Sequence, residues 1–295
     1  MKNKKHLIGG IILFGIIILV FLLPFAISKG SGINVSSTSG EKIAVIPING
    51  VIYDSNKYLK QLKKFYEDDS VKAIIIRINS PGGAVGASQE IYSEIMKLKK
   101  NKPILASFQD VAASGGFYIA SACSEIITNP GTLTGSIGVI MQYINFKNLV
   151  KFAKIKPVVI KSGKFKDTGS PYRDLTKEEK KYLTNVIMNV YRQFVKDVYA
   201  SRKEKGLKLK LLKKIADGRI FTGEDAIKYN LADKLGNFYV AVDEAAKLGK
   251  ITGKPKLVYP KNKKDLFGRI IDEGKSQLGI SGKFIDGINI LYLWR

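Results

Sequence analysis

The segment DVAASGGFYIA, residues 110–120, carries a serine, Ser114, between small residues at the predicted start of an apolar helix. A small-residue turn at a helix start is where an α/β enzyme would present a nucleophile, but a serine hydroxyl is weak at neutral pH and needs an adjacent base. The usual base is histidine, and the one histidine of this chain, His6, precedes a membrane-length apolar segment. A Ser-His-Asp triad is therefore excluded, which leaves lysine as the activator.

A lysine acts as a base only in its neutral form, and its reference pKa is about 10.4. It therefore needs a desolvated setting without a close carboxylate. Residues 156–176, KPVVIKSGKFKDTGSPYRDLT, predict a buried strand and then a Gly/Ser-containing loop that bears Lys161, Lys164 and Lys166. These requirements do not decide which of the three lysines is the base. Asp167 is expected to point away from its neighbour if the segment is extended, because adjacent strand residues face opposite sides.

Two successive predicted strands end in small-residue turns, NSPGG at residues 79–83 and the turn that contains Ser114. Glycine allows close backbone approach, so Gly82 and Gly83 can leave free amides near a helix start. In an acyl-transfer enzyme such amides form an oxyanion hole, and Gly115 could supply the second donor. Each turn alone is most often a plain tight turn. Their conjunction at two strand ends favours a site.

The elements that must position these residues alternate between strands and helices, which predicts an α/β fold with a mainly parallel sheet. Sites in such sheets gather outside the carboxyl ends of the strands. The predicted strands are KIAVIPINGVI, VKAIIIRINS and KPILASFQD, and the predicted helices between them are NKYLKQLKKFYEDDS and ASQEIYSEIMKLKKN. Later, Thr176 and Glu179 have capping-box spacing and open a long packed helix.

Residues 7–27 carry no charge, and this length predicts a transmembrane anchor rather than a cleaved signal, although Ala26 and Ser28 allow cleavage as an alternative. The lysines before it predict a cytoplasmic N-terminus and an exported body. The net charge is +24. Its lysines are dispersed, which indicates a solvated surface with affinity for anionic lipid rather than a nucleic-acid site. The single cysteine, Cys123, excludes an intrachain disulfide and is expected in the core.

Several motifs in order resemble the signal peptide peptidase A family of membrane-anchored Ser-Lys proteases. They are NSPGG, AASGGFYIA, TLTGSIGV, KSGKFKDTGSP with LTKEE, and ADGRIFTGEDAIKYNLADKLG. The resemblance covers roughly residues 42–245. It implies an α/β fold of the ClpP and crotonase type, a repeated ββα superhelix with mainly parallel sheets, preceded by one N-terminal transmembrane helix.

Carried over by position, the resemblance makes Ser114 the nucleophile and Lys166, 52 residues later, the general base. It places the oxyanion amides at Gly83 and Gly115, and the hydroxyl that orients the lysine at Ser136. An uncharged hydroxyl suits this role, because a carboxylate there would keep the lysine protonated. Phe117 stands where the family often has tyrosine, and no matched catalytic position departs from the pattern.

The chain holds both candidates in one copy, so it resembles the half-length form of the family. That form is a dome-like homo-octamer, in which a site can be completed across a subunit boundary. The implied substrates are residual signal peptides or other apolar unfolded peptides, cut at the outer side of the cytoplasmic membrane. The other implied contacts are with membrane lipid through the N-terminal helix, and no cofactor, metal or nucleic acid is expected.

The resulting expectation is a serine endopeptidase with five segments. They are a cytoplasmic basic flank at 1–6, an anchor at 7–27, a flexible linker at 28–41, a ClpP/crotonase-like protease domain at 42–260 and a C-terminal tail at 261–295. The tail is expected to pack on the body, with an edge strand, membrane contact or a neighbour's groove as alternatives.

Three other functions remain open. The stomatin-associated Ser-Lys membrane protease has a similar fold, but a shorter interval between its serine and lysine. A crotonase-type acyl-CoA enzyme would use the paired amides, but it has no need of Ser114, and CoA is not exported. A non-catalytic scaffold that binds apolar peptides would not require every matched catalytic position to be intact.

Overall fold

The computed structural model describes residues 40–260 and 289–293. The predicted anchor at 7–27 and most of the predicted tail lie outside these residues. Among the helices of the described ranges, none combines the length and the apolar character needed to cross a membrane.

The described residues form one large, mostly parallel sheet. Its strand order is β10-β1-β2-β4-β5-β9, with β6 beside β4 and β8 beside β6, and the β6–β8 pair alone is antiparallel. The strands are β1 (Lys42–Asn49), β2 (Val71–Ser80), β4 (Ile104–Ala113), β5 (Glu125–Thr128), β6 (Leu133–Gly135), β8 (Ile220–Thr222), β9 (Lys234–Leu235) and β10 (Lys256–Val258). This arrangement confirms the predicted α/β class with a mainly parallel sheet.

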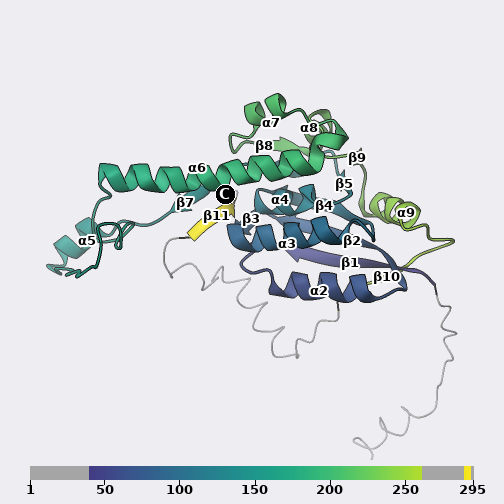
Figure 1. The fold of residues 1–295 in the computed structure, drawn as a ribbon, viewed down its shortest axis with the longest axis horizontal. Coiled ribbons are helices and arrows are strands. Elements are labelled where there is room, and N and C mark those ends of the chain that lie inside the picture. Colours follow the sequence, from purple (N-terminus) through teal and green to yellow (C-terminus); the bar gives the residue numbers. More distant parts are fainter. Residues whose placement is uncertain (1–39, 261–288, 294–295) are drawn as a thin grey trace, which may run out of the picture. The chain divides into compact units, whose positions relative to one another are not determined.

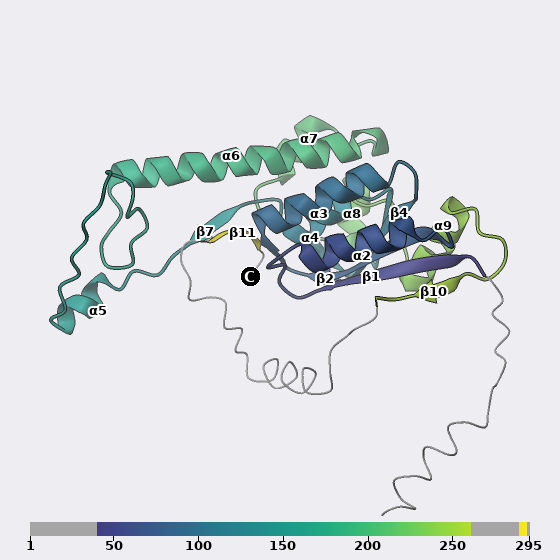
Figure 2. The same ribbon diagram turned by 60° about the horizontal axis from the view of Figure 1, so that its bottom comes forward.

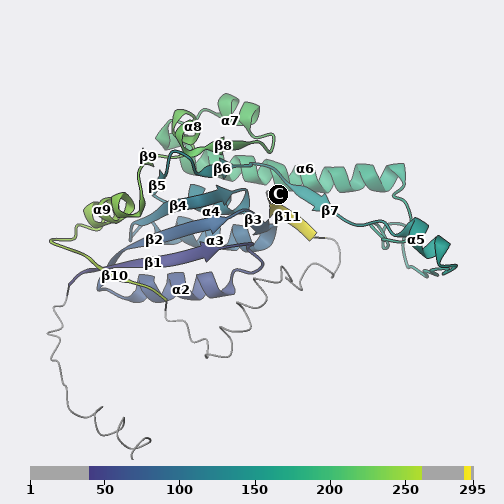
Figure 3. The ribbon, with the colours of Figure 1, turned by 180° about the vertical axis from the view of Figure 1, so that it is seen from behind.

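A small antiparallel sheet adjoins the carboxyl ends of these strands, with the order β3-β11-β7. Its strands are β3 (Gly82–Ala84), β7 (Ile140–Gln142) and β11 (Asn289–Leu293). In Figures 1 and 3 the C-terminal strand β11, in yellow, lies between β3 and β7, and Figure 2 shows it beside β7. The C-terminal residues that the structure describes therefore form a middle strand, not an edge strand.

Helices cover both faces of the large sheet, as Figures 1 and 3 show from opposite sides. The helices are α2 (Asn56–Glu67), α3 (Val85–Leu98), α4 (Gly115–Ser121), α5 (Lys147–Phe152), α6 (Lys177–Arg202), the 3₁₀ turn η1 (Lys203–Lys205), α7 (Leu209–Ile215), α8 (Gly223–Lys228) and α9 (Phe238–Leu248). The strand side chains alternate between the two faces. Ile74, Ile76 and Ile78 of β2 face the core under α2, α3 and α4, while Ala73 and Ile75 face α9.

Helix α6 begins at the predicted capping box. The Thr176 side chain accepts a hydrogen bond from the Glu179 amide, and the Glu179 carboxylate accepts one from the Thr176 amide. Only the second half of α6 enters the core, where Phe194 and Val198 are buried. At its end, buried Arg202 forms an ion pair with Asp233 and so fixes α6 to the β5 and β9 edge of the sheet.

The structure corrects one predicted element. Residues 156–161 were expected to form a buried strand, but they are neither a strand nor buried, and the side chain of Ile160 is 98% exposed. A short run of β-branched residues forms a strand only where a neighbouring strand and packed side chains support it. No strand of the described residues lies beside this segment.

Candidate active site

Ser114 joins β4 to α4 in a constrained backbone conformation. Its φ is 52° and its ψ is −114°, outside the regions that residues with a side chain usually adopt. The conformation is held on both sides, because the Ser114 amide donates to the Gly135 carbonyl at 2.8 Å and the Ser114 carbonyl accepts from the Tyr118 amide at 2.7 Å. The Ser114 side chain is buried, with 1% of the residue exposed, and no hydrogen bond of its hydroxyl is found within the described ranges.

The amide of Gly83 lies beside the turn that holds Ser114. A Cβ atom placed on Gly115 would lie 3.1 Å from the Gly83 nitrogen and 2.6 Å from the hydroxyl oxygen of Ser88. Glycine at position 115 therefore lets the two backbone segments approach each other closely. This brings together the two residues predicted to supply the oxyanion amides.

Ile52 fixes the orientation of the Gly83 amide. The Ile52 amide donates to the Gly82 carbonyl at 2.9 Å, and the Ile52 carbonyl accepts from the Ala84 amide at 2.7 Å. Successive residues of a strand direct their backbone groups to opposite sides, so the Gly83 amide faces away from Ile52. A side chain at position 83 is excluded, since its Cβ would lie 2.0 Å from the Ile52 carbonyl oxygen.

Ser136 follows β6 as Ser114 follows β4. The two strands are paired with Ala113 opposite Gly135, which places the two serines at the same end of the sheet. Ser136 also has a positive φ, 49°, and its amide donates to the Arg219 carbonyl at 2.8 Å. The structure thus brings Ser114, Ser136 and both glycine amides to one edge of the sheet, as parallel strands predict.

Lys166 lies elsewhere, in the turn before α6. The ring of its neighbour Phe165 contacts Tyr182 with ring centroids 5.1 Å apart, whereas Tyr118 of α4 contacts Phe194 at 4.9 Å. Tyr182 and Phe194 are 12 residues apart on α6, which is about 18 Å at 1.5 Å per residue. One copy of the chain therefore does not bring Lys166 to Ser114.

The three candidate lysines differ in whether a carboxylate is paired with them. Lys161 pairs with Asp167 at 2.5 Å and Lys164 pairs with Glu178. Lys166 is exposed and has no carboxylate partner within the described ranges. Lys166 alone among the three thus meets the condition that a general base avoid a stabilising carboxylate.

Asp167 does not lie in an extended segment, so the predicted strand alternation does not apply to it. It lies in a turn, where Arg173 and Lys161 hold its carboxylate. Hydrogen bonds from these two cations hold the pKa of Asp167 well below its usual range. The carboxylate next to the candidate base is therefore already neutralised by other residues.

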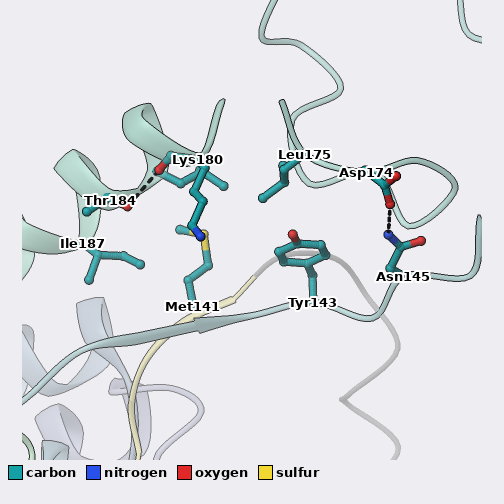
Figure 4. Close-up of a pocket in the computed structure, with 9 residues that line it drawn as sticks. Met141, Tyr143, Asn145, Asp174, Leu175, Lys180, Thr184 and Ile187 are labelled. Carbon is teal, nitrogen blue, oxygen red and sulfur yellow. Dashed lines mark hydrogen bonds between the residues drawn. The ribbon is translucent and has the colours of Figure 1, made fainter. Parts of the chain in front are cut away.

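A cavity of about 440 Å³ lies between β7 and the first turns of α6, away from Ser114. Figure 4 shows Met141 and Tyr143 on one side and Lys180, Thr184 and Ile187 of α6 on the other. It is lined by apolar side chains and a few polar groups, so it suits an apolar side chain better than an ion. No cluster of metal-ligating residues occurs in the described part of the chain.

Three structural contributors to the site were not predicted from the sequence, namely Ile52, Ser88 and Arg219. Ile52 and Arg219 act through their backbone groups, and the residue type gives no sign of such a role. Ser88 is fully buried and donates to the Ala84 carbonyl at 3.0 Å, a bond that depends on the fold around it.

Comparison with known proteins adds the following. Residues 96–252 match Peptidase family S49, and residues 29–128 match Clp protease. The chain is 35% identical over 282 residues to the "Putative protease MJ0651" of Methanocaldococcus jannaschii, which covers 90% of each chain. It is 35% identical over 235 residues to the "Putative signal peptide peptidase SppA" of Enterococcus faecium, covering 75% of this chain and 67% of that one. Protease 4 of Haemophilus influenzae is 33% identical over 217 residues, 70% of this chain and 35% of the relative.

Proposed function

This chain belongs to peptidase family S49, and we propose from that premise that it is an endopeptidase in which Ser114 is the nucleophile and Lys166 the general base. The observation that carries the proposal is the meeting of Ser114 with the amides of Gly83 and Gly115 at one edge of the sheet. A hydroxyl beside two convergent amides is the arrangement that acyl transfer needs.

The chemistry follows from these groups. The neutral amine of Lys166 takes the proton of the Ser114 hydroxyl while its oxygen attacks the peptide carbonyl, and the amides of Gly83 and Gly115 stabilise the oxyanion. Lys166 then gives the proton to the leaving amine. A water molecule, deprotonated by the same lysine, attacks the acyl-serine, so that the second product leaves as a carboxylate and Ser114 recovers its proton.

We propose that Lys166 of one copy completes the site of another. Two features support this. The turn that contains Lys166 and the helix that follows Ser114 contact parts of α6 that are about 18 Å apart. The apolar side chains between β7 and Lys166 are also exposed, Phe152 to 87% and Val158 to 79%. Contiguous exposed apolar side chains commonly mark a protein interface. Burial of Lys166 there would favour its neutral form, because desolvation disfavours the charged one.

The proposed substrates are signal peptides or other apolar unfolded peptides at the outer side of the cytoplasmic membrane. The relative named a signal peptide peptidase and the uncharged residues 7–27 support this part of the proposal. The same uncharged segment would anchor the protein by a single helix, with its N-terminus inside.

The test is hydrolysis of signal-peptide-like substrates by the purified full chain. Ser114→Ala and Lys166→Ala should each abolish turnover. Lys161→Ala and Lys164→Ala are matched controls from the same loop and should retain it. Full activity of Lys166→Ala, with loss in either control, would contradict the assignment of the base.

A further inference from the structure

Helices α6 and α7 carry positive charge that few acids offset. Residues 180–215 contain eleven lysines and arginines but only two acids, Asp197 and Glu204. Residues 54–69, which include α2, instead contain four lysines and four acids. In Figures 1 and 3, α6 and α7 lie at the top of the view and α2 lies at the bottom. The balanced and the unbalanced segment are therefore on opposite sides of the molecule.

The cations of α6 lie on the face of the helix that points away from the core. Phe194 and Val198 are buried, whereas Arg192 and Lys196 are exposed. Residues four apart lie on the same face of a helix. Lys203 follows Lys196 by seven residues, about two turns, and is exposed on that face where α6 ends. These three cations therefore form a row along the outer side of α6.

Helix α7 adds four lysines beside this row. It contacts α6, and its buried residues Leu212 and Ile215 belong to the main core, so its other side faces the solvent. Figure 2 shows the two helices together along one side of the molecule. The exposed lysines of α7 and its N-cap are Lys208, Lys210, Lys213 and Lys214. With the three cations of the α6 row, they form what is named here the α6–α7 basic surface.

This surface has no internal partners. Among the described residues, no carboxylate lies within ion-pair distance of any of its seven cations. Their neighbour Lys205 differs, because it pairs with Glu125 and Asp233. Like charges one helical turn apart destabilise a helix. An anion from outside the chain would relieve this repulsion, so the surface is suited to an anionic partner.

The side chains of this surface fit the headgroups of a bilayer. Six of its seven cations are lysines, whose compact and strongly hydrated charges suit diffuse negative charge, whereas specific phosphate sites favour the bidentate fork of arginine. Met188, one turn before Arg192, is 41% exposed, and Leu209 is 37% exposed. Apolar side chains among lysines can enter the headgroup layer of a membrane.

We propose that the α6–α7 basic surface docks the body of the protein onto an anionic phospholipid bilayer. Docking would lay α6 along the membrane surface and set the orientation of the candidate active site relative to the bilayer. The proposed function needs only an anchor, and the new inference rests on it in placing the protein at a membrane. One lysine near an anionic surface strengthens association about fivefold, so a few of these cations are enough to hold the body in place.

Lysine footprinting of the full chain tests this proposal without relying on turnover. The chain is reconstituted in phosphatidylcholine vesicles, with and without phosphatidylglycerol, and amine acetylation is followed by mass spectrometry. Lys196, Lys203 and Lys213 should react at least about fivefold more slowly when phosphatidylglycerol is present. This protection should disappear in about 1 M salt, where the Debye length is about 3 Å. Lys60 and Lys63 of α2 are the controls and should react equally in both kinds of vesicle.

Two variants with the same loss of charge separate this surface from charge in general. The first replaces the exposed lysines of α7 and its N-cap: Lys208→Gln, Lys210→Gln, Lys213→Gln and Lys214→Gln. The second is the matched control and replaces those of α2: Lys57→Gln, Lys60→Gln, Lys63→Gln and Lys64→Gln. The protection of Lys196 and Lys203 by phosphatidylglycerol should be lost in the first variant and kept in the second.

Several results would overturn the docking proposal. They are equal acetylation of Lys196 and Lys203 in the two kinds of vesicle, and an equal effect of the two variants on their protection. Protection by double-stranded DNA or by glycerol phosphate in solution, without protection by phosphatidylglycerol vesicles, would also overturn it, because the partner would then be a nucleic acid or a free phosphate. A chain that shows the footprint but hydrolyses no peptide would overturn only the peptidase assignment.

Discussion

Ser114 and Gly115 are neighbours, and the site depends on a backbone feature of each. Ser114 has a positive φ that orients its hydroxyl at the end of β4, and Gly115 has no side chain to separate its turn from Gly83. Such strained positions persist only where surrounding contacts hold them, and they cluster at functional sites. The strain at Ser114 is held by the hydrogen bonds of its own amide and carbonyl.

Gly115→Ala should damage the site without unfolding the protein. The added methyl group would lie 2.6 Å from the Ser88 hydroxyl and 3.1 Å from the Gly83 nitrogen, so the two amides must move apart. Loss of one oxyanion donor costs about 10²-fold in kcat, and we expect a decrease of that order in steady-state kinetics. Gly131→Ala is the control, because its methyl group meets no atom within 4 Å. Equal losses in the two variants would show that the effect is not specific to the amide pair.

Cys123 should be inert in the folded protein. It is 2% exposed, and desolvation by burial raises its pKa to about 12. Because the thiolate is the reactive form, a thiol reagent at pH 8 should label the folded chain far more slowly than the chain in denaturant. Rapid labelling of the folded protein, measured by mass spectrometry, would contradict its place in the core.

The residues of the site differ in how far the sequence could predict them. Ser114, Gly83, Gly115 and Ser136 follow strand ends, and a parallel sheet gathers strand ends at one edge, so the structure unites them as expected. Lys166 is a prediction of a different kind, from motif order alone. The structure does not bring it to Ser114, so its role as the base stays a prediction.

At the scale of elements, helix α6 links two regions with different surroundings. Its second half packs under α4, and its first half lies beside the cavity and the turn that contains Lys166. The hydrophobic periodicity along the helix predicted one continuous buried face. That periodicity cannot tell whether a face packs on the same chain or on another one, because the burial of apolar area is not directional.

The capping box should stabilise the start of α6 by a measurable amount. Removal of an N-cap hydroxyl costs about 1 kcal/mol, which lowers the melting temperature of a protein of this size by about 2 to 4 °C. We expect this decrease for Thr176→Ala in calorimetry. Thr184→Ala is the control and should change the melting temperature little, because the exposed Thr184 hydroxyl donates to the Lys180 carbonyl within the helix and does not cap its end.

Glu179 makes the stability of the first turn of α6 depend on pH. Hydrogen bonds from Arg173, and from the Thr176 amide, lower the pKa of Glu179 to about 2 in the folded chain, below the unfolded value of about 4.3. A lowered folded pKa stabilises the fold above the unfolded value, and this contribution is lost as the pH falls through about 2. Amide exchange should therefore show a protected first turn at pH 4. In Glu179→Gln that protection should not vary between pH 4 and pH 2, and an equally pH-dependent variant would contradict the assignment.

At the scale of the whole molecule, the sequence predicts the central strands β1, β2 and β4 well, because each carries its own apolar pattern, but it does not predict the short strands β8, β9 and β10. It predicts residues 140–176 poorly, and there the apolar side chains are exposed, as Ile144 at 64% shows. Within the described residues, little of the chain packs on this stretch, so its apolar pattern does not lead to burial there. The pairing of the C-terminal strand β11 is also hard to predict from the sequence, because its partner strands β3 and β7 are each three residues long.

The most direct test of the central claim is to mix two inactive variants. If Lys166 of one copy serves Ser114 of the next, co-assembled Ser114→Ala and Lys166→Ala chains should regain hydrolysis, up to about one quarter of the activity of the parent for random mixing around a ring. Each variant assembled alone is the control and should be inactive. Recovery of activity on mixing is the result that we predict. Complete inactivity at every mixing ratio, with mixed assembly verified by differently tagged chains, would contradict a site shared between copies.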